Sequence, residues 1–125
     1  MILVGGATGA FLRYLVSEFA NRMLSKGFPW GTLSVNLLGC FVIGLLWSIT
    51  KQYSLPEGLH AFLFIGLLGA FTTFSTFGLE SLTLLENGKL LLGFANIAFS
   101  NILGLMLVWI GAHLSDWLFT LLNVS

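Results

Sequence analysis

The chain has 125 residues, of which 57% are apolar and only five basic and five acidic residues carry a formal charge. A soluble domain has charges on about a quarter of its residues, so 8% charged residues exclude an ordinary water-facing domain. The zero net charge also argues against a nucleic-acid partner, because binding phosphates requires a basic surface. We therefore expect the chain to be embedded in a lipid bilayer.

Four apolar segments are long enough to cross a bilayer, which takes about 20 mostly apolar residues. The first is the weakest, because Arg13 and Glu18 interrupt it and charges are costly at the bilayer centre. The expected spans are approximately residues 2-20, 29-50, 58-85 and 90-117. Because the connections are short, we expect residues 1-125 to form one all-α domain with four transmembrane helices. This domain would belong to a multi-pass protein of the cell membrane, such as the bacterial inner or plasma membrane.

The first segment contains Arg13, and a charge within a span is a candidate functional residue. Its guanidinium could attract anions toward an aqueous mouth of the protein. Alternatively, its long side chain could extend to the lipid headgroups. The sequence leaves both interpretations open.

Three pairs of small residues recur at four-residue spacing along the chain. They are Gly5 with Gly9, Cys40 with Gly44, and Ser100 with Gly104. This spacing predicts close helix contacts, either within one subunit or between subunits. Cys40, the only cysteine, is interpreted as a packing residue.

Pairs of uncharged polar side chains also follow the helical spacing in the last three segments. They are Thr32 with Asn36, Thr72 with Thr76, and Asn96 with Ser100. Such stripes either tie helices together or line a path for a polar solute. Three stripes in one small protein favour a path.

The third segment reads GLLGAFTTFSTFGLE from Gly66 to Glu80, with three glycines and four hydroxyl residues. Glycine and β-branched residues weaken a helix, so we expect a local break near Gly69 to Thr73. Carbonyl oxygens released by a break suit a small cation. A continuous helix whose hydroxyls bond to carbonyls four residues earlier is the alternative. Glu80 is expected to be accessible to water at the end of this span.

Phenylalanines recur at three-residue spacing in the same segment, at Phe71, Phe74 and Phe77. Such a stripe often serves only packing. The edge of an aromatic ring is electropositive, however, so rings facing a pore can favour an anion without a fixed charge. A small hydrated anion also needs replacement hydrogen bonds, which Asn36, Ser75 and Thr76 could provide.

Residues that commonly serve catalysis are scattered. His60 and His113 lie far apart, and neither belongs to a metal-ligand motif. The carboxylates lie near span ends without forming a cluster. We therefore expect that the protein is not an enzyme.

The loop charges predict only a weak preference for one orientation. If loops alternate sides, Arg22, Lys26 and Lys89 lie on one side, and Lys51 and the N-terminal amine on the other. The chain could insert in both orientations and pair with an inverted copy. Alternatively, the small number of charges makes the count uninformative.

Three motifs together resemble the Fluc family of small dual-topology fluoride ion channels. The most specific runs from Gly69 to Phe77 (GAFTTFSTF), with Glu80 after it. The stretch from Gly31 to Leu37 (GTLSVNL) is similar to the second-helix motif of that family, and Gly5 to Arg13 (GGATGAFLR) to its first. The resemblance covers nearly the whole chain.

This resemblance implies an antiparallel homodimer with an inverted copy, two fluoride pores, and passive fluoride export down the electrochemical gradient. It also implies a structural sodium ion at the centre of the dimer, bound by the backbone carbonyls of Gly69 and Thr72. The implied ion pathway comprises Asn36, Phe74, Phe77, Ser75, Thr76, Glu80, Ser100 and Arg13. Asn96 stands where some relatives have tyrosine, and its role stays open, as does that of Asn101.

Two other classes of small membrane protein share some of these features. A small dual-topology multidrug/proton exporter has similar size but carries a coupling glutamate in the middle of its first span, where this chain has Arg13. A non-transporting assembly subunit would explain the small-residue pairs and leave the hydroxyl-rich third segment unexplained.

Overall fold

The computed structural model describes residues 1–122, which contain helices and no strand. The long helices are α1 (Ile2–Met23), α2 (Trp30–Gln52) and α6 (Leu90–Leu121). The third predicted span consists of four consecutive elements: α3 (Glu57–His60), the π-helix η1 (Ala61–Leu68), α4 (Gly69–Phe71) and α5 (Phe74–Glu86). The prediction of an all-α fold with a broken third helix is confirmed.

Three of these helical units are long and apolar enough to cross a membrane, namely α2, the composite unit Glu57–Glu86, and α6. Large apolar side chains point outward along them and along α1, with Leu3 88% and Leu91 83% exposed. Such a surface is stable only against lipid or another apolar surface. The chain is therefore a multi-pass membrane protein.

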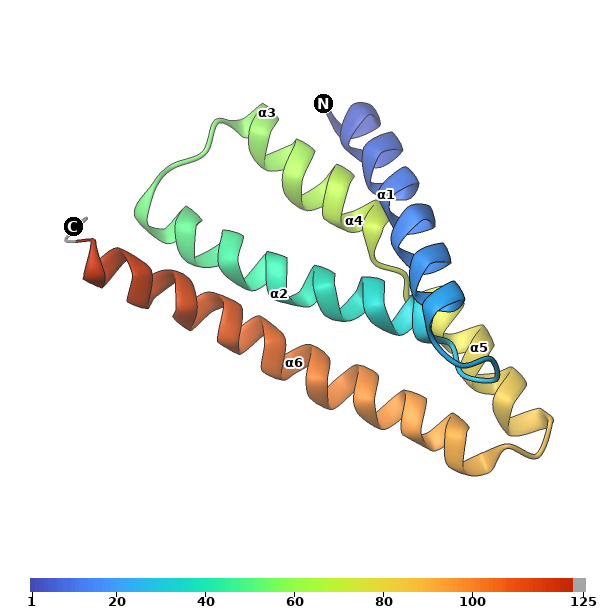
Figure 1. Cartoon of the computed structure of the whole chain (residues 1–125). Helices are drawn as coiled ribbons and strands as arrows, with labels where there is room; N and C mark the ends of the chain where they lie inside the picture. The colour runs from blue at the N-terminus through green and yellow to red at the C-terminus, as the bar shows by residue number, and fades with distance from the viewer. Residues whose placement is uncertain (123–125) are drawn as a thin grey trace.

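Helices α2 and α6 lie side by side and run in the same direction (Figure 1). A Cβ atom added at Gly44 would collide with the Val108 carbonyl, and one added at Gly104 would lie 3.4 Å from Cys40 Sγ. Ser48, near the far end of α2, donates a hydrogen bond to the Asp116 carboxylate. Cys40, Gly44 and Gly104, from two of the predicted small-residue pairs, therefore serve packing within one subunit.

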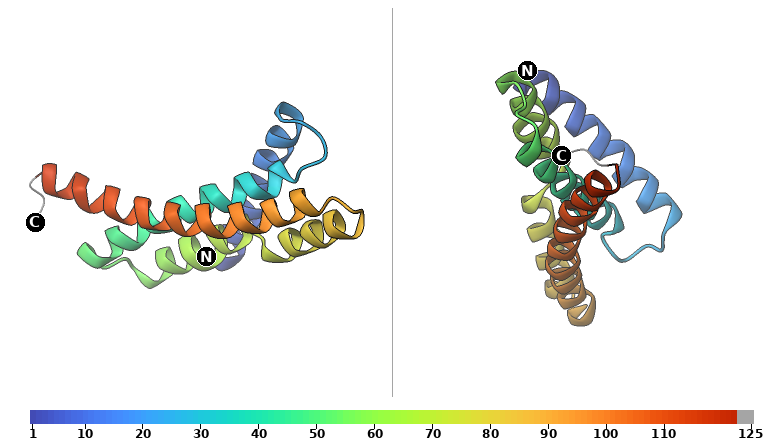
Figure 2. Two further views of the ribbon diagram at one scale, coloured as in Figure 1. Left: turned by 90° about the horizontal axis from the view of Figure 1, so that it is seen from below. Right: turned by 90° about the vertical axis from the view of Figure 1, so that its left-hand side faces the viewer.

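Helix α1 crosses the composite third unit and packs against η1 (Figures 1 and 2). Gly5 and Gly9 bring the two backbones together: a Cβ atom at Gly5 would lie 2.5 Å from the Phe62 carbonyl oxygen, and one at Gly9 would collide with that of Leu67. This third small-residue pair also acts within the subunit. The core is small and lies mainly where α1, α2 and the third unit meet. It comprises Ala20, Leu33, Val35, Leu68, Phe71, Phe77 and Leu84.

The connecting loops alternate between the two ends of the molecule (Figure 1). The turns at residues 24–29 and 87–89 lie at one end, and the loop at residues 53–56 lies at the other. Gly27 and Gly88 make the first two turns possible with positive φ angles of 103° and 77°. Lys26 and Lys89 thus share one end and Lys51 occupies the other, as the sequence predicts.

Candidate functional site

The third membrane unit is interrupted at Thr72 and Thr73, which have extended backbones between α4 and α5. The amide of Thr72 and its own hydroxyl both donate to the Leu68 carbonyl, at 3.1 and 3.0 Å. Helix α4 ends at that point. Thr72 thus belongs to the break and Thr76 to α5, so these two residues do not form a stripe at helical spacing.

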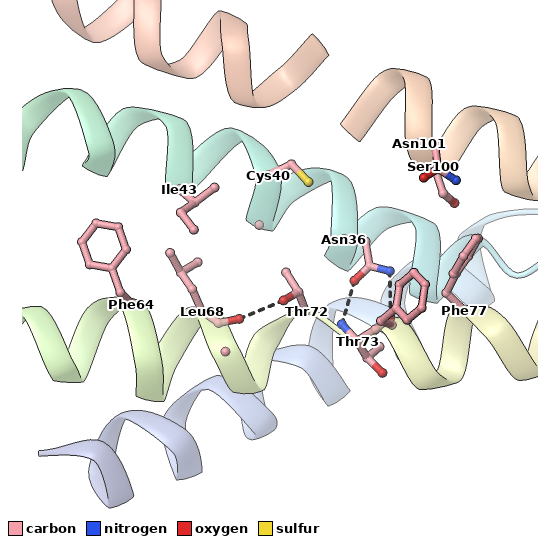
Figure 3. A pocket seen from close by; sticks show the side chains of 13 residues that line it. Asn36, Cys40, Ile43, Phe64, Leu68, Thr72, Thr73, Phe77, Ser100 and Asn101 are labelled. Atoms are coloured by element: carbon pink, nitrogen blue, oxygen red, sulfur yellow. Dashed lines mark hydrogen bonds between the residues drawn. The ribbon is translucent and has the colours of Figure 1, made fainter. Parts of the chain in front are cut away.

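Asn36 of α2 pairs with the backbone of Thr73 at the break (Figure 3). Its Nδ2 donates to the Thr73 carbonyl at 3.0 Å, and its Oδ1 accepts from the Thr73 amide at 2.8 Å. In a continuous helix, the Thr73 amide would bond to the Gly69 carbonyl four residues earlier. Instead, the Thr73 amide donates to Asn36 Oδ1. The Asn36 side chain therefore stabilises the break and leaves the Gly69 carbonyl without its helical donor.

Thr73 also begins the next helix. Its hydroxyl accepts from the Thr76 amide at 3.3 Å and donates to the Thr76 hydroxyl at 3.0 Å, which makes it the N-cap of α5. Thr73 was not among the predicted site residues. The available signal was its position as the hydroxyl residue directly before a regular helical segment.

A cavity of about 370 Å³ lies between the break, α2 and α6 (Figure 3). It brings together six of the predicted site residues from three helical units. They are Asn36, Gly69, Thr72, Phe74, Phe77 and Ser100. Their side chains and carbonyls supply uncharged donors, uncharged acceptors and aromatic rings, which can surround a small ion without a charged filter.

Two phenylalanine rings form part of this lining. The ring centroids of Phe74 and Phe77 are 5.5 Å apart and the rings are tilted by 46°. Phe77 is 8% exposed, whereas Phe74 is 81% exposed. Phe71, on the other side of the break, is buried and belongs to the core. The three phenylalanines therefore do not form one stripe, because the break redirects the chain between the first and the second.

Helix α6 places Ser100 and Asn101 at the cavity. The Ser100 hydroxyl is buried and has no hydrogen-bond partner among residues 1–122. Asn101 donates to the Ile97 carbonyl of its own helix at 2.7 Å. Asn96 does not line the cavity: it is buried and donates to Ser81 at 2.9 Å, which ties α6 to α5. Sequence reasoning missed Asn101 and Cys40 as lining residues, because spacing alone does not show which face of a helix meets a cavity.

A smaller cavity of about 260 Å³ lies between α1, α2 and the break. Its lining includes Arg13, Thr32, Thr73 and Thr76. Thr73 lines both cavities, so the break separates the two spaces.

Glu80 is held close to this region by Thr32, whose hydroxyl donates to Glu80 Oε1 at 2.9 Å. The other carboxylate oxygen, Oε2, is buried and lacks a partner in the described part of the chain. Glu80 thus lies inside α5 and half-buried, not at the end of the helix, because α5 continues to Glu86. Ser75 is exposed and lines neither of the two cavities.

The sequence matches the family model described as CrcB-like protein, Camphor Resistance (CrcB), over residues 1–112. The chain belongs to this CrcB-like family. Among its relatives is a protein of Salinibacter ruber that is 52% identical over 111 residues, covering 89% of this chain and 84% of the relative. A relative from Parabacteroides distasonis is 42% identical over 123 residues, covering 98% and 96%. One from Dehalococcoides mccartyi is 45% identical over 120 residues, covering 94% and 92%.

All three relatives carry the name fluoride-specific ion channel FluC. The resemblance stated from the sequence motifs is thereby confirmed. Within the CrcB-like family these names denote channels and not enzymes, in agreement with the scattered titratable residues. Family membership also counts against a multidrug exporter and against an assembly subunit without transport.

Proposed function

We propose that this CrcB-like protein is a fluoride-selective channel through which fluoride leaves the cell passively, down its electrochemical gradient. The observation that carries the proposal is the cavity of about 370 Å³ at a helix break, lined by neutral hydrogen-bonding groups and phenylalanine rings. The chain also aligns over most of its length with relatives named as fluoride-specific channels.

The lining supports passage of a small, strongly hydrated anion. The Asn36 amide nitrogen has two N–H groups, and only one is needed for the Thr73 carbonyl. The second N–H and the unpartnered Ser100 hydroxyl can replace water around fluoride. The edges of Phe74 and Phe77 add electropositive contacts without a fixed charge.

The remaining pathway residues extend this route in our proposal. Arg13 lies at the second cavity beside Thr76, where its charge attracts anions. Ser75 and Thr76, in the first turn of α5, would supply further hydroxyl groups to the ion, and Glu80, later in the same helix, would border the route. Glu80 is half-buried, and the hydrogen bond that it accepts from Thr32 fixes the orientation of its carboxylate.

We infer that two inverted copies form the conducting unit, with two pores. The exposed side of the site supports this inference. Phe74, Ser75 and Asn101 are exposed in the single chain although they lie at membrane depth. Polar groups facing lipid are costly, and a second copy would cover them. The weak charge difference between the two ends permits insertion in either orientation. Light scattering in detergent should give twice the chain mass of 13.6 kDa.

A structural sodium ion at the centre of this dimer is part of the proposal. The backbone oxygens of Gly69 and Thr72 would hold it, since carbonyl oxygens are hard ligands and the break separates the Gly69 carbonyl from its helical donor. Residues 1–122 contain no cluster of three or more His, Cys, Asp or Glu side chains that could bind a metal. Bound there, sodium would supply positive charge and join the two subunits at their breaks.

Fluoride efflux from proteoliposomes tests the function. Purified protein should release trapped fluoride, measured with a fluoride electrode, and should not release trapped chloride beyond protein-free vesicles. Equal release of both anions would contradict selectivity. Drug-driven proton movement without fluoride release would favour an exporter. Replacing sodium by N-methylglucamine during purification should reduce efflux if the ion is structural.

A further inference from the structure

Helix α2 contacts the break through two residues on one face. Asn36 holds the Thr73 backbone through two hydrogen bonds, and Gly39, three residues later, lies against Thr72. Residues three apart share a helix face, so α2 meets both residues of the break at once. The first contact is polar and the second is steric.

Gly39 leaves space that the Thr72 methyl group fills. Gly39 is buried, and a Cβ atom added there would overlap Thr72 Cγ2. The next atoms are at ordinary contact distances, with Phe71 Cδ1 at 3.5 Å and Thr72 Cβ at 3.7 Å. A single methyl group is therefore the obstacle to a side chain at position 39.

Thr72 cannot turn this methyl group away without loss. Its hydroxyl donates to the Leu68 carbonyl at 3.0 Å, which fixes the rotation about the Cα–Cβ bond. A different rotamer would break that bond. The alternative is a shift of the Thr72 backbone, but the next residue is held to Asn36 at 2.8 and 3.0 Å.

We propose that Gly39 is a positioning residue of the channel: by lacking a side chain it sets the place of the Thr72 carbonyl relative to Asn36. The proposal rests on the proposed function, in which this carbonyl binds sodium and Asn36 contacts fluoride. The structure assigns the role to Gly39 through Thr72 and not through direct contact with an ion.

A four-variant cycle tests this role. Gly39→Ala should reduce fluoride efflux by about tenfold or more, as expected for strongly coupled neighbours. Thr72→Ser removes only the methyl group and keeps the hydroxyl and the main-chain carbonyl, so its own efflux is the reference value for the double variant. The double variant Gly39→Ala with Thr72→Ser should recover most of the lost efflux. Gly39→Ala with Thr72→Val, which keeps a methyl-bearing branch, should not recover.

The sodium dependence separates positioning from a general packing defect. The sodium concentration for half-maximal efflux should rise in Gly39→Ala and return toward the wild-type value in the Thr72→Ser double variant. Gly6→Ala is the matched control, because nothing lies within 4 Å of a Cβ atom added there. Reduced efflux with an unchanged sodium dependence would overturn the positioning role.

Two other results would also overturn the proposal: wild-type efflux in Gly39→Ala, and a double variant as impaired as Gly39→Ala. If Gly39→Ala does not fold, recovery of yield and melting temperature in the double variant supports the steric contact between Gly39 and Thr72. A double variant that also fails to fold contradicts it. Absence of fluoride efflux from the wild type would reject the proposed function instead. The melting temperatures of the four variants would then still test the contact between Gly39 and Thr72.

Discussion

Replacing Asn36 by alanine removes both hydrogen bonds that tie α2 to the break. The lost bonds are those to the Thr73 carbonyl at 3.0 Å and from the Thr73 amide at 2.8 Å. Hydrogen bonds between membrane helices contribute about 0.6 kcal/mol each on average, with a maximum of about 1.7. The two Thr73 backbone groups are also left unpaired at membrane depth, which adds to the cost.

We therefore expect Asn36→Ala to lower the free energy of unfolding by about 2–4 kcal/mol. Fluoride efflux should fall as well, because the break loses the side chain that holds it in place and the cavity loses the Asn36 N–H groups. Reversible unfolding in mixed detergent micelles gives the stability, and the fluoride electrode gives the efflux.

Asn101→Ala is the matched control for this measurement. Asn101 is also an asparagine on a membrane helix at the same cavity, but it donates only to the Ile97 carbonyl of its own helix. Loss of this hydrogen bond should lower the free energy of unfolding by about 1 kcal/mol or less. If Asn36→Ala were no more destabilising than Asn101→Ala, the two bonds to Thr73 would not be what stabilises the break.

Three further predictions concern the rings, the helix contact and the charged residue. Phe74→Ile and Phe77→Ile should each strongly reduce fluoride efflux, since both remove an electropositive ring edge; unchanged efflux in both variants would reject the aromatic part of the site. Gly9→Ala should destabilise the protein by about 1–3 kcal/mol through collision with the η1 backbone, whereas Gly6→Ala should not; equal melting temperatures would contradict the close contact. Arg13→Gln should slow efflux at low ionic strength and have little effect at high salt, and a salt-independent loss would argue against long-range attraction.

The break and its approximate position could be predicted from the residues around it, but its cause could not. Glycines and β-branched residues weaken a helix locally, so the stretch from Gly69 to Thr73 was identified correctly. The interruption falls at Thr72 and Thr73 because Asn36, far away in the sequence, bonds to the Thr73 backbone. A pairing between a side chain and a distant backbone has no signature in local propensity.

The same limit applies to several site residues. Asn96 and Ser100 are four apart and were interpreted as one stripe, yet Asn96 bonds to Ser81 while the Ser100 hydroxyl lies unpartnered at the cavity. Spacing predicts that two residues share a helix face. It does not predict what that face meets.

The sequence by itself determined that this protein lies in a membrane, that it consists of four helical segments, and that its third segment is weakened. These properties follow from composition and local periodicity, which act over one or two helical turns. Only the tertiary structure decided which groups meet at the weak point. Asn36, Gly39, Ser100 and the Gly69 carbonyl come from three helical units, and packing of whole helices brings them to one cavity. A membrane helix satisfies its own backbone, so a broken one depends on its neighbours for the bonds it has lost.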